Sequence, residues 1–250
     1  MGYLPPIRRQ VVVPAGAELA FEVFTAEIGR WWPVADLSVY GAGAGVAFEG
    51  DRLVERGPDG AASVWGTVLD RVPPHRLRLT WHPGADPAKA SEVEVTFAEV
   101  SGELTLVTLE HRGWERFADP AAARAEYDHG WPHVLDGYVA CVPADEAAPA
   151  PGPAWVALMH TRGPAVPPGT SVFAHPDFRE HAAFLRRLAG RGVLVAAGPL
   201  DGAGEGMTVL RLPDAGAVAE YARLASEDDL SVVRGVLNVR VRPWRVALTG

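Results

Sequence analysis

Two histidines lie four residues apart, His129 and His133, a spacing that would place two imidazoles side by side on a helix as ligands of a metal ion. Gly130 and Pro132 lie between them, and both residue types disfavour a regular helical turn. The sequence offers no third ligand beside this pair. We therefore expect neither a metal site here nor any other cofactor.

Another histidine, His181, lies within a segment whose apolar residues recur at helical spacing. The segment covers residues 177–188, and its apolar positions are Phe178, Ala182, Leu185 and Leu188. A histidine on the apolar face of such a helix is either a hydrogen-bonded core residue or a general acid or base. The helix pattern alone leaves both interpretations open.

Tryptophan is unevenly distributed along the chain. Six of the eight tryptophans lie in the first 131 residues, at positions 31, 32, 65, 81, 114 and 131. Indole rings fill a core or stack on a planar ligand. His111 lies near the end of an expected strand, where alternation allows either His111 or Glu110 to point inwards, and we favour His111. The residues that we predict to contact a ligand in this half are Trp32, Trp65, Trp81, His111, Trp131 and Tyr138.

The elements expected to position these side chains form an α+β unit. A short strand over residues 7–13 precedes an amphipathic helix over residues 17–24, and apolar residues then alternate with polar ones between turns from about residue 46 to 112. Asp119 suits a helix N-cap and Pro120 the first helical position, so a long helix closes the unit. These elements predict a helix-grip arrangement, in which a curved antiparallel sheet wraps the last helix and can leave a cavity.

Over residues 7–142 the sequence resembles the START-like (SRPBCC) superfamily, and within it the homologues of the heat-shock-protein ATPase activator. The segments that carry the resemblance are residues 23–24, 31–32, 65–68, 73–74, 77–81 and 130–135. The resemblance implies a pocket for a small apolar or aromatic molecule, as in the polyketide cyclase relatives of this fold. A fold alone does not determine a function.

The remaining residues predict a second, smaller unit. Strand-like runs at residues 155–160, 193–197, 207–212 and 237–246 alternate with two amphipathic helices, and the order is βαββαβ. This order is typical of a ferredoxin-like fold with helices on one face of the sheet. The open face then needs an apolar partner, so we expect a homodimer through this unit.

The second half resembles the YCII-related family over residues 155–247. The matching segments are residues 158–164, 180–185, 192–200, 228–235 and 241–244. The resemblance implies a dimeric α+β barrel with a histidine and an aspartate in a pocket, which correspond to His181 and Asp229. Leu230 replaces the proline that follows this aspartate in the family, so Asp228 remains an alternative.

A carboxylate that hydrogen-bonds one ring nitrogen of a histidine fixes its tautomer and increases the basicity of the other nitrogen. This pair would therefore suit proton abstraction or elimination. His160 is a further predicted ligand contact, and together with Arg162 it would form an anion-binding wall or else stabilise a loop.

Composition narrows the other possibilities. The net charge of -8 and the single lysine argue against nucleic acid as a partner, and the single cysteine excludes an internal disulfide. We expect no membrane-spanning segment and a cytoplasmic location, because no apolar stretch is long enough to span a bilayer and the first ten residues contain two prolines and two arginines.

Four prolines within residues 143–153 predict a linker, so the expected domains are residues 1–142 and 155–250, joined by residues 143–154.

Three functional hypotheses follow. The first is a protein that binds a small apolar or aromatic molecule in the first domain and carries cofactor-free cyclase, isomerase or lyase chemistry in the second. The second is a ligand-binding or sequestration protein without catalysis. The third is a co-chaperone-like interaction module, which the resemblance of the first half suggests.

Overall fold

The computed structural model describes residues 4–143, 152–200 and 204–246. The chain divides into two compact units: residues 6–148 form the first unit, and residues 149–250 with residues 1–5 form the second. The predicted linker, residues 143–154, lies largely outside the described residues. None of the described helices is long and apolar enough to cross a membrane.

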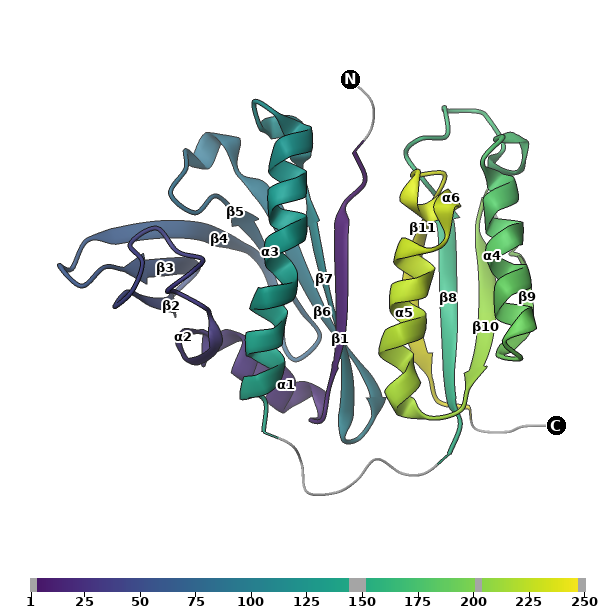
Figure 1. Ribbon diagram of the computed structural model, residues 1–250, viewed down its shortest axis with the longest axis horizontal. Helices are drawn as coiled ribbons and strands as arrows, with labels where there is room; N and C mark the ends of the chain where they lie inside the picture. Colours follow the sequence, from purple (N-terminus) through teal and green to yellow (C-terminus); the bar gives the residue numbers. More distant parts are fainter. Residues whose placement is uncertain (1–3, 144–151, 201–203, 247–250) are drawn as a thin grey trace. The chain divides into compact units, whose positions relative to one another are not determined.

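The first unit is a seven-stranded antiparallel sheet with helices packed against it (Figure 1). Along the sheet the strand order is β1-β7-β6-β5-β4-β3-β2, so the strands from β2 to β7 form a meander and β1 is added beside β7. The class is mixed α+β, as predicted, and the arrangement is consistent with a START-like domain. The elements are β1 (Ile7–Val13), α1 (Ala17–Thr25), α2 (Ile28–Trp31), β2 (Gly45–Glu49), β3 (Arg52–Arg56), β4 (Ala62–Val72), β5 (Arg76–Trp81), β6 (Ser91–Ser101), β7 (Leu104–Arg112) and α3 (Pro120–Cys141), with short 3₁₀ turns at Pro87–Lys89 and Trp114–Arg116.

Helix α3 begins as the sequence predicts. The side chain of Asp119 accepts a hydrogen bond from the backbone N–H of Ala122 at 3.0 Å, and Pro120 occupies the first turn. The sequence also made a regular turn around Pro132 doubtful, and there the structure differs, because α3 continues through this residue. A proline cannot donate to the carbonyl four residues before it, which belongs to Asp128. That carbonyl accepts instead from the guanidinium of Arg9 at 3.4 Å, while the Asp128 carboxylate lies 2.5 Å from the same guanidinium.

The backbones of β4 and β5 come unusually close together at one point. At Gly66 the backbone approaches β5 so closely that an added Cβ atom would lie 1.9 Å from the carbonyl oxygen of Thr80. Only glycine can occupy such a position without displacing the neighbouring strand. The pairing register of β4 also shifts on both sides of this point, between Leu53 and Val54 and between Val68 and Asp70.

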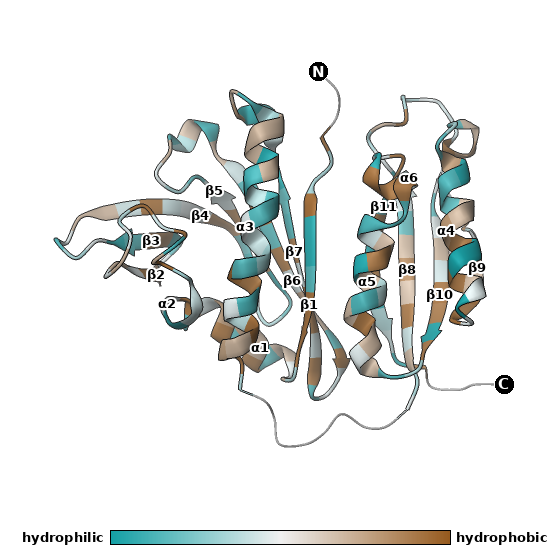
Figure 2. Cartoon of the chain, in the orientation of Figure 1, coloured by the Kyte–Doolittle hydropathy of each residue, from teal (hydrophilic) through white to brown (hydrophobic). Residues whose placement is uncertain are grey.

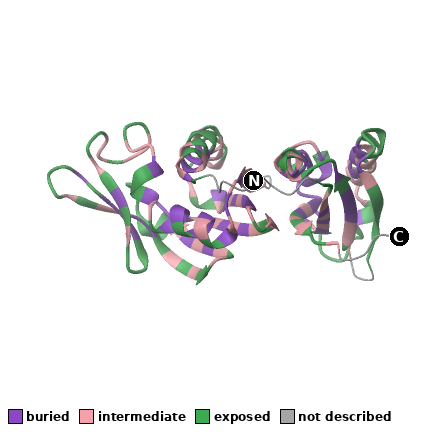
Figure 3. Cartoon of the chain, turned by 90° about the horizontal axis from the view of Figure 1, so that it is seen from below, coloured by how far each residue is buried: buried purple, intermediate pink, exposed green. Residues whose placement is uncertain are grey.

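The second unit has a four-stranded antiparallel sheet in the order β11-β8-β10-β9. Its helices α4 and α5 each carry both apolar and polar residues (Figure 2), and the two helices lie on one face of this sheet (Figure 3). The buried residues Val156, Leu158 and His160 of β8 face these helices, so alternation places Trp155, Ala157 and Met159 on the opposite face. The elements are β8 (Ala154–Arg162), α4 (Phe178–Gly190), β9 (Leu194–Pro199), β10 (Gly206–Leu212), α5 (Val218–Glu227), α6 (Leu230–Val233) and β11 (Leu237–Trp244), with short 3₁₀ turns at Val172–Ala174 and Ala215–Ala217.

Candidate functional site

His181 and Asp229 meet beneath the helices of the second unit. His181 lies on the buried face of α4, and Asp229 is the N-cap residue of α6. The Nδ1 atom of His181 lies 2.6 Å from Oδ2 of Asp229, and the Asp229 side chain is fully buried. The other carboxylate oxygen, Oδ1, accepts from both the backbone N–H and the hydroxyl of Ser231, at 3.0 and 2.6 Å. Both oxygens therefore act as acceptors, which is the arrangement of an ionised carboxylate.

The protonation state of Asp229 follows from these contacts. Burial alone would raise the pKa of Asp229, but the hydrogen bonds from His181 and Ser231 outweigh burial and hold its pKa below the usual value. Since the carboxylate is ionised, the His181 nitrogen that faces it carries a proton. Asp228, the alternative from the sequence, ends α5, and its carbonyl oxygen accepts from the guanidinium of Arg187 at 2.7 Å. Asp229 is the residue that contacts His181.

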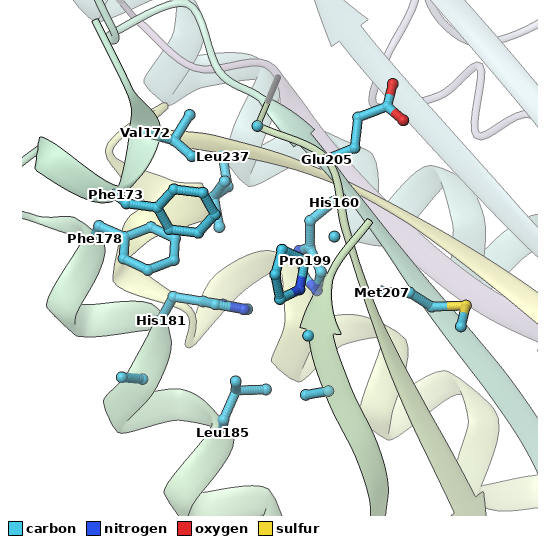
Figure 4. A pocket seen from close by; sticks show the side chains of 15 residues that line it. His160, Val172, Phe173, Phe178, His181, Leu185, Pro199, Glu205, Met207 and Leu237 are labelled. Carbon is cyan, nitrogen blue, oxygen red and sulfur yellow. The ribbon is translucent and has the colours of Figure 1, made fainter. Parts of the chain in front are cut away.

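A cavity of about 230 Å³ lies next to this pair. Figure 4 shows the ring of His181 directed into the cavity from α4, with His160 of β8 on the facing wall. The remaining lining is mostly apolar and includes Val172, Phe173, Phe178, Leu185, Pro199 and Leu237. Such a space, mostly apolar with few polar groups, is typical of a site for a small organic molecule.

His160 has a different environment from His181. It is almost fully buried, its Nε2 atom lies 3.3 Å from the hydroxyl of Thr208, and its ring centroid lies 4.6 Å from that of His181. Burial, and secondarily the neighbouring His181, lower the pKa of His160 to about 4, although Asp229 acts in the opposite direction. His160 is therefore neutral at physiological pH.

The predicted wall of His160 and Arg162 does not form. The guanidinium of Arg162 donates to the carbonyl oxygens of Val166, at 3.0 Å, and of Pro167. Arg162 is not among the residues that line the cavity. Of the two roles that the sequence left open for this residue, the structure shows the stabilisation of a loop.

The four tryptophans among the predicted ligand contacts of the first unit form a close-packed aromatic cluster. The centroids of the Trp32 ring lie 5.0, 5.7 and 6.2 Å from those of Trp65, Trp81 and Trp131. Trp32, Trp81 and Trp131 border a small space inside the unit of about 20 Å³. Such a volume holds about one water molecule. Tyr138 lies elsewhere in the core, where its hydroxyl donates to the carbonyl oxygen of Ala20 at 2.8 Å, and burial raises its pKa.

His111 points inwards and Glu110 outwards, as alternation predicts. The hydroxyl of Ser91 donates to the carbonyl oxygen of Trp81 at 3.0 Å, so the Nε2–H group of His111 donates to this hydroxyl at 2.7 Å. The Nδ1 atom accepts from the indole N–H of Trp131 at 3.1 Å. Burial lowers the pKa of His111 to about 3. Both ring nitrogens are thus used within the core.

The structure also reveals polar residues that the sequence analysis missed. Ser231 follows Asp229 by two residues at the start of a helix, a capping pattern that the sequence contains. Thr208 alternates with Leu210 and Leu212 on the face of β10 that packs on the helices, so a lone polar residue in that row was the available signal. Among the described residues, no group of three or more histidine, cysteine or acidic side chains could hold a metal ion. His133 pairs with Asp36 instead, at 3.2 Å.

The first unit thus has the architecture of a helix-grip protein with an aromatic interior. Residues 14–142, just over half of the chain, match the family described as "Activator of Hsp90 ATPase homolog 1-like protein". The chain belongs to this family. No curated protein matches it.

Three solved structures illustrate the similarity of the first unit. The chain is 29% identical to the self-sacrificing resistance protein CalC from Micromonospora echinospora, with a TM-score of 0.44, and the match covers 55% of this chain and 94% of that one. The chain is 35% identical to the anthrahydroquino-gama-pyrone synthase Txn09, with a TM-score of 0.41, and the match covers 55% of this chain and 96% of that one. It is 16% identical to the Aha1 dimer from Colwellia psychrerythraea, with a TM-score of 0.42, and this match covers 58% of this chain and 100% of that one.

Proposed function

We propose that this chain acts on a small apolar molecule and that its second unit catalyses cofactor-free proton transfer, of the isomerase, cyclase or lyase type. The observation that carries the proposal is the 2.6 Å hydrogen bond between His181 and the buried Asp229 at the wall of an apolar cavity. Perturbed titratable groups beside a pocket are typical of catalytic sites.

Each member of the pair has a separate role. Asp229 holds the proton on Nδ1 of His181, so that Nε2 remains for the substrate. Ser231 fixes the second oxygen of Asp229 and hence the plane of the carboxylate. Nε2 would take a proton from a substrate carbon or hydroxyl as a general base, and the resulting imidazolium would return the proton elsewhere on the substrate as a general acid.

The arrangement of the second unit supports its assignment as a ferredoxin-like, YCII-related domain. Its main elements follow each other as strand, helix, strand, strand, helix, strand, and the first strand, β8, lies in the sheet between the third and the fourth. The pairing of His181 with Asp229 agrees with what the resemblance implies for these two positions. We propose residues 155–250 as this domain and residues 1–142 as the START-like one.

The test compares substitutions of the pair with a matched control. Asp229→Asn and His181→Ala should each reduce turnover at least about a hundredfold, because the base loses either its oriented tautomer or its nitrogen. Asp177→Asn makes the same chemical change in a partly exposed ion pair with Arg234 and should leave turnover unchanged. The assay follows cyclohex-3-enone as it isomerises to the conjugated enone, by ultraviolet absorbance, alongside hydrogen–deuterium exchange into a panel of small ketones and lactones.

Melting curves of the same variants separate catalysis from structure. Full activity in both pair variants, or a wild-type chain that transfers no proton on any compound of the panel, would contradict the proposal. A large loss of thermal stability on removal of either partner would make the pair a structural feature of the core, since a buried group would be left unsatisfied at a cost of about 1 to 3 kcal/mol.

The interior of the first unit is a second candidate site. Three tryptophans border the same small space, and indole faces are suited to stacking on planar apolar molecules. Because that space is about 20 Å³, binding requires the aromatic side chains to move apart. Tryptophan emission should then change on titration with planar aromatic and polyketide-like compounds, whereas an unchanged spectrum across such a library would favour pure core packing.

Two further functions have weaker support. Sequestration without catalysis requires only the cavities and predicts binding without turnover. A co-chaperone-like role is supported only by the family description, and a shared fold does not by itself imply a shared function.

A further inference from the structure

One buried polar atom at the wall of the second unit's cavity lacks a partner. Nδ1 of His160 makes no hydrogen bond with any described residue, although the His160 side chain lines the cavity and is only 4% exposed. A buried polar group without a partner costs free energy, so such groups are rare in folded proteins. Nδ1 is itself covered by neighbouring atoms, so a bound molecule that fills the cavity would supply the missing partner once the His160 ring turns towards it.

The hydroxyl of Thr208 determines which kind of group Nδ1 presents. Among the described residues, this hydroxyl contacts only Nε2 of His160, at 3.3 Å. If Nε2 carried the ring proton, both the hydroxyl hydrogen and the lone pair of Nδ1 would be unsatisfied. If the hydroxyl donates to Nε2, only the Nδ1–H group remains without a partner, which is the cheaper arrangement. Neutral His160 therefore presents an N–H donor.

The rings of the two histidines are in contact with each other, and they present complementary groups side by side at the cavity. His181 presents a proton-accepting Nε2, and His160 presents a donor, with ring centroids 4.6 Å apart. Both groups can reach neighbouring atoms of one small molecule. An acceptor of a carbon-bound proton beside a donor to an oxygen is the arrangement that stabilises an enolate as it forms.

The other residues that line the cavity disfavour a charged substrate. No lysine or arginine is among the described residues that line the cavity, and its carboxylate, Glu205, is exposed. An anionic substrate would lose its hydration here without gaining a cation. The volume of about 230 Å³ is below the range usual for drug-sized ligands, so the molecule is small.

We propose that the substrate of this pocket is a small uncharged carbonyl compound with an acidic C–H bond next to the carbonyl group, and that His160 is a catalytic residue whose Nδ1–H binds the carbonyl oxygen. The proposal rests on the proposed function. As His181 Nε2 takes the proton, the C–H electron pair forms a carbon–carbon double bond and the carbonyl π electrons move to the oxygen held by His160. Where the substrate also has a carbon–carbon double bond in the β,γ position, the negative charge extends over it. Return of the proton from His181 to the γ carbon then moves this double bond into conjugation with the carbonyl group and gives an isomer, with no other reactant.

Thr208 is a positioning residue in this scheme, because it acts through the tautomer of His160. Thr208→Val removes the hydroxyl at nearly constant shape, whereas Thr208→Ser retains it. Nitrogen-15 spectra of the histidine-labelled chain report the tautomer directly, with the His160 signals assigned by their loss in His160→Phe. We expect the Nδ1–H tautomer in the wild-type chain and in Thr208→Ser, and a shift towards Nε2–H in Thr208→Val. A wild-type ring protonated on Nε2 would overturn the proposal.

A binding measurement tests the oxygen contact with 4-nitrophenol in slightly acidic buffer, where the phenol is uncharged and its hydroxyl can donate to His181 and accept from His160. Its absorbance should change on binding to the wild-type chain, and His160→Phe, which keeps a ring but has no donor, should weaken binding at least about tenfold. Equal binding by this folded variant, or no binding by the wild-type chain at millimolar probe, would overturn the proposal. Binding that depends on His160, without turnover in the isomerisation assay, would support the carbonyl site while contradicting the proposed catalysis.

Discussion

At the scale of single residues, three buried histidines differ in what their ring nitrogens contact. Both nitrogens of His111 are used by Ser91 and Trp131, whereas His181 uses one nitrogen for Asp229 and His160 leaves one without a protein partner. Burial alone therefore does not distinguish a structural histidine from a functional one. An unpartnered nitrogen alone does not distinguish them either, because Nδ1 of the buried His82 also lacks a partner. What sets His160 and His181 apart is that they line a cavity.

The neutral state of His111 makes the stability of the first unit depend on pH. The folded state keeps His111 neutral down to about pH 3, whereas the unfolded chain takes up a proton near the ordinary value of 6.5. The unfolded state then binds more protons below pH 6.5, so the free energy of unfolding should fall as pH decreases towards 3. For one residue the slope approaches about 1.4 kcal/mol per pH unit.

Urea unfolding followed by tryptophan emission between pH 7 and 5 measures this dependence. His111→Gln should lower stability at pH 7 and flatten the slope, since its side chain does not titrate. His129→Gln, which replaces an exposed histidine of the same unit, should keep the wild-type slope. Equal slopes in the wild-type and His111→Gln chains would contradict the prediction.

At the scale of elements, one buried carboxylate fixes the segment before β2 to the sheet. Glu55 of β3 is fully buried and accepts hydrogen bonds from the backbone N–H groups of Val39 and Tyr40 and from the indole of Trp65, at 2.8, 2.9 and 2.9 Å. Hydrogen bonds to a charged acceptor are stronger than neutral ones. Glu55 thus holds the segment between α2 and β2 beside the aromatic cluster.

Glu55→Gln should lower the free energy of unfolding by about 1 to 3 kcal/mol, because the amide nitrogen of glutamine cannot accept from these donors. Glu49→Gln is the matched control: it removes a surface ion pair with Arg56 in the neighbouring strand, which water screens, so the free energy of unfolding should change far less. Denaturation by urea measures both. Equal losses in the two variants would show that the carboxylate of Glu55 is not needed.

The sequence predicted elements better than contacts, and the reason is physical. Alternation and capping residues are local, so the meander and the start of α3 were predictable. The continuation of α3 through Pro132 depends on Arg9, more than a hundred residues away, and the contacts of Glu55 and Thr208 likewise join different strands. A single sequence does not specify which distant residues will meet.

At the scale of the whole molecule, the second unit is expected to form a homodimer. The face of its sheet opposite α4 and α5 carries Trp155, Ala157 and Met159, and the side chain of Trp244 beside Trp155 is 48% exposed. Burying apolar surface contributes about 25 cal/mol per Å². Light scattering should give twice the chain mass, and Met159→Glu should give a monomer. Arg179→Glu, on the exposed side of α4, should leave the dimer intact. A monomeric wild-type chain would contradict the prediction.

The close approach of β4 and β5 at Gly66 is between backbone atoms, so it does not depend on which side chains fill the interior of the first unit. The two backbones approach so closely there that no room remains for even a methyl group. Replacement of the aromatic side chains in the interior does not alter this approach of the two backbones. One scaffold could therefore hold interiors of very different capacity, from this nearly filled one to a roomy one, as large side chains are traded for small ones. Redesign of this unit as a receptor should begin with Trp32, Trp81 and Trp131 and keep Gly66.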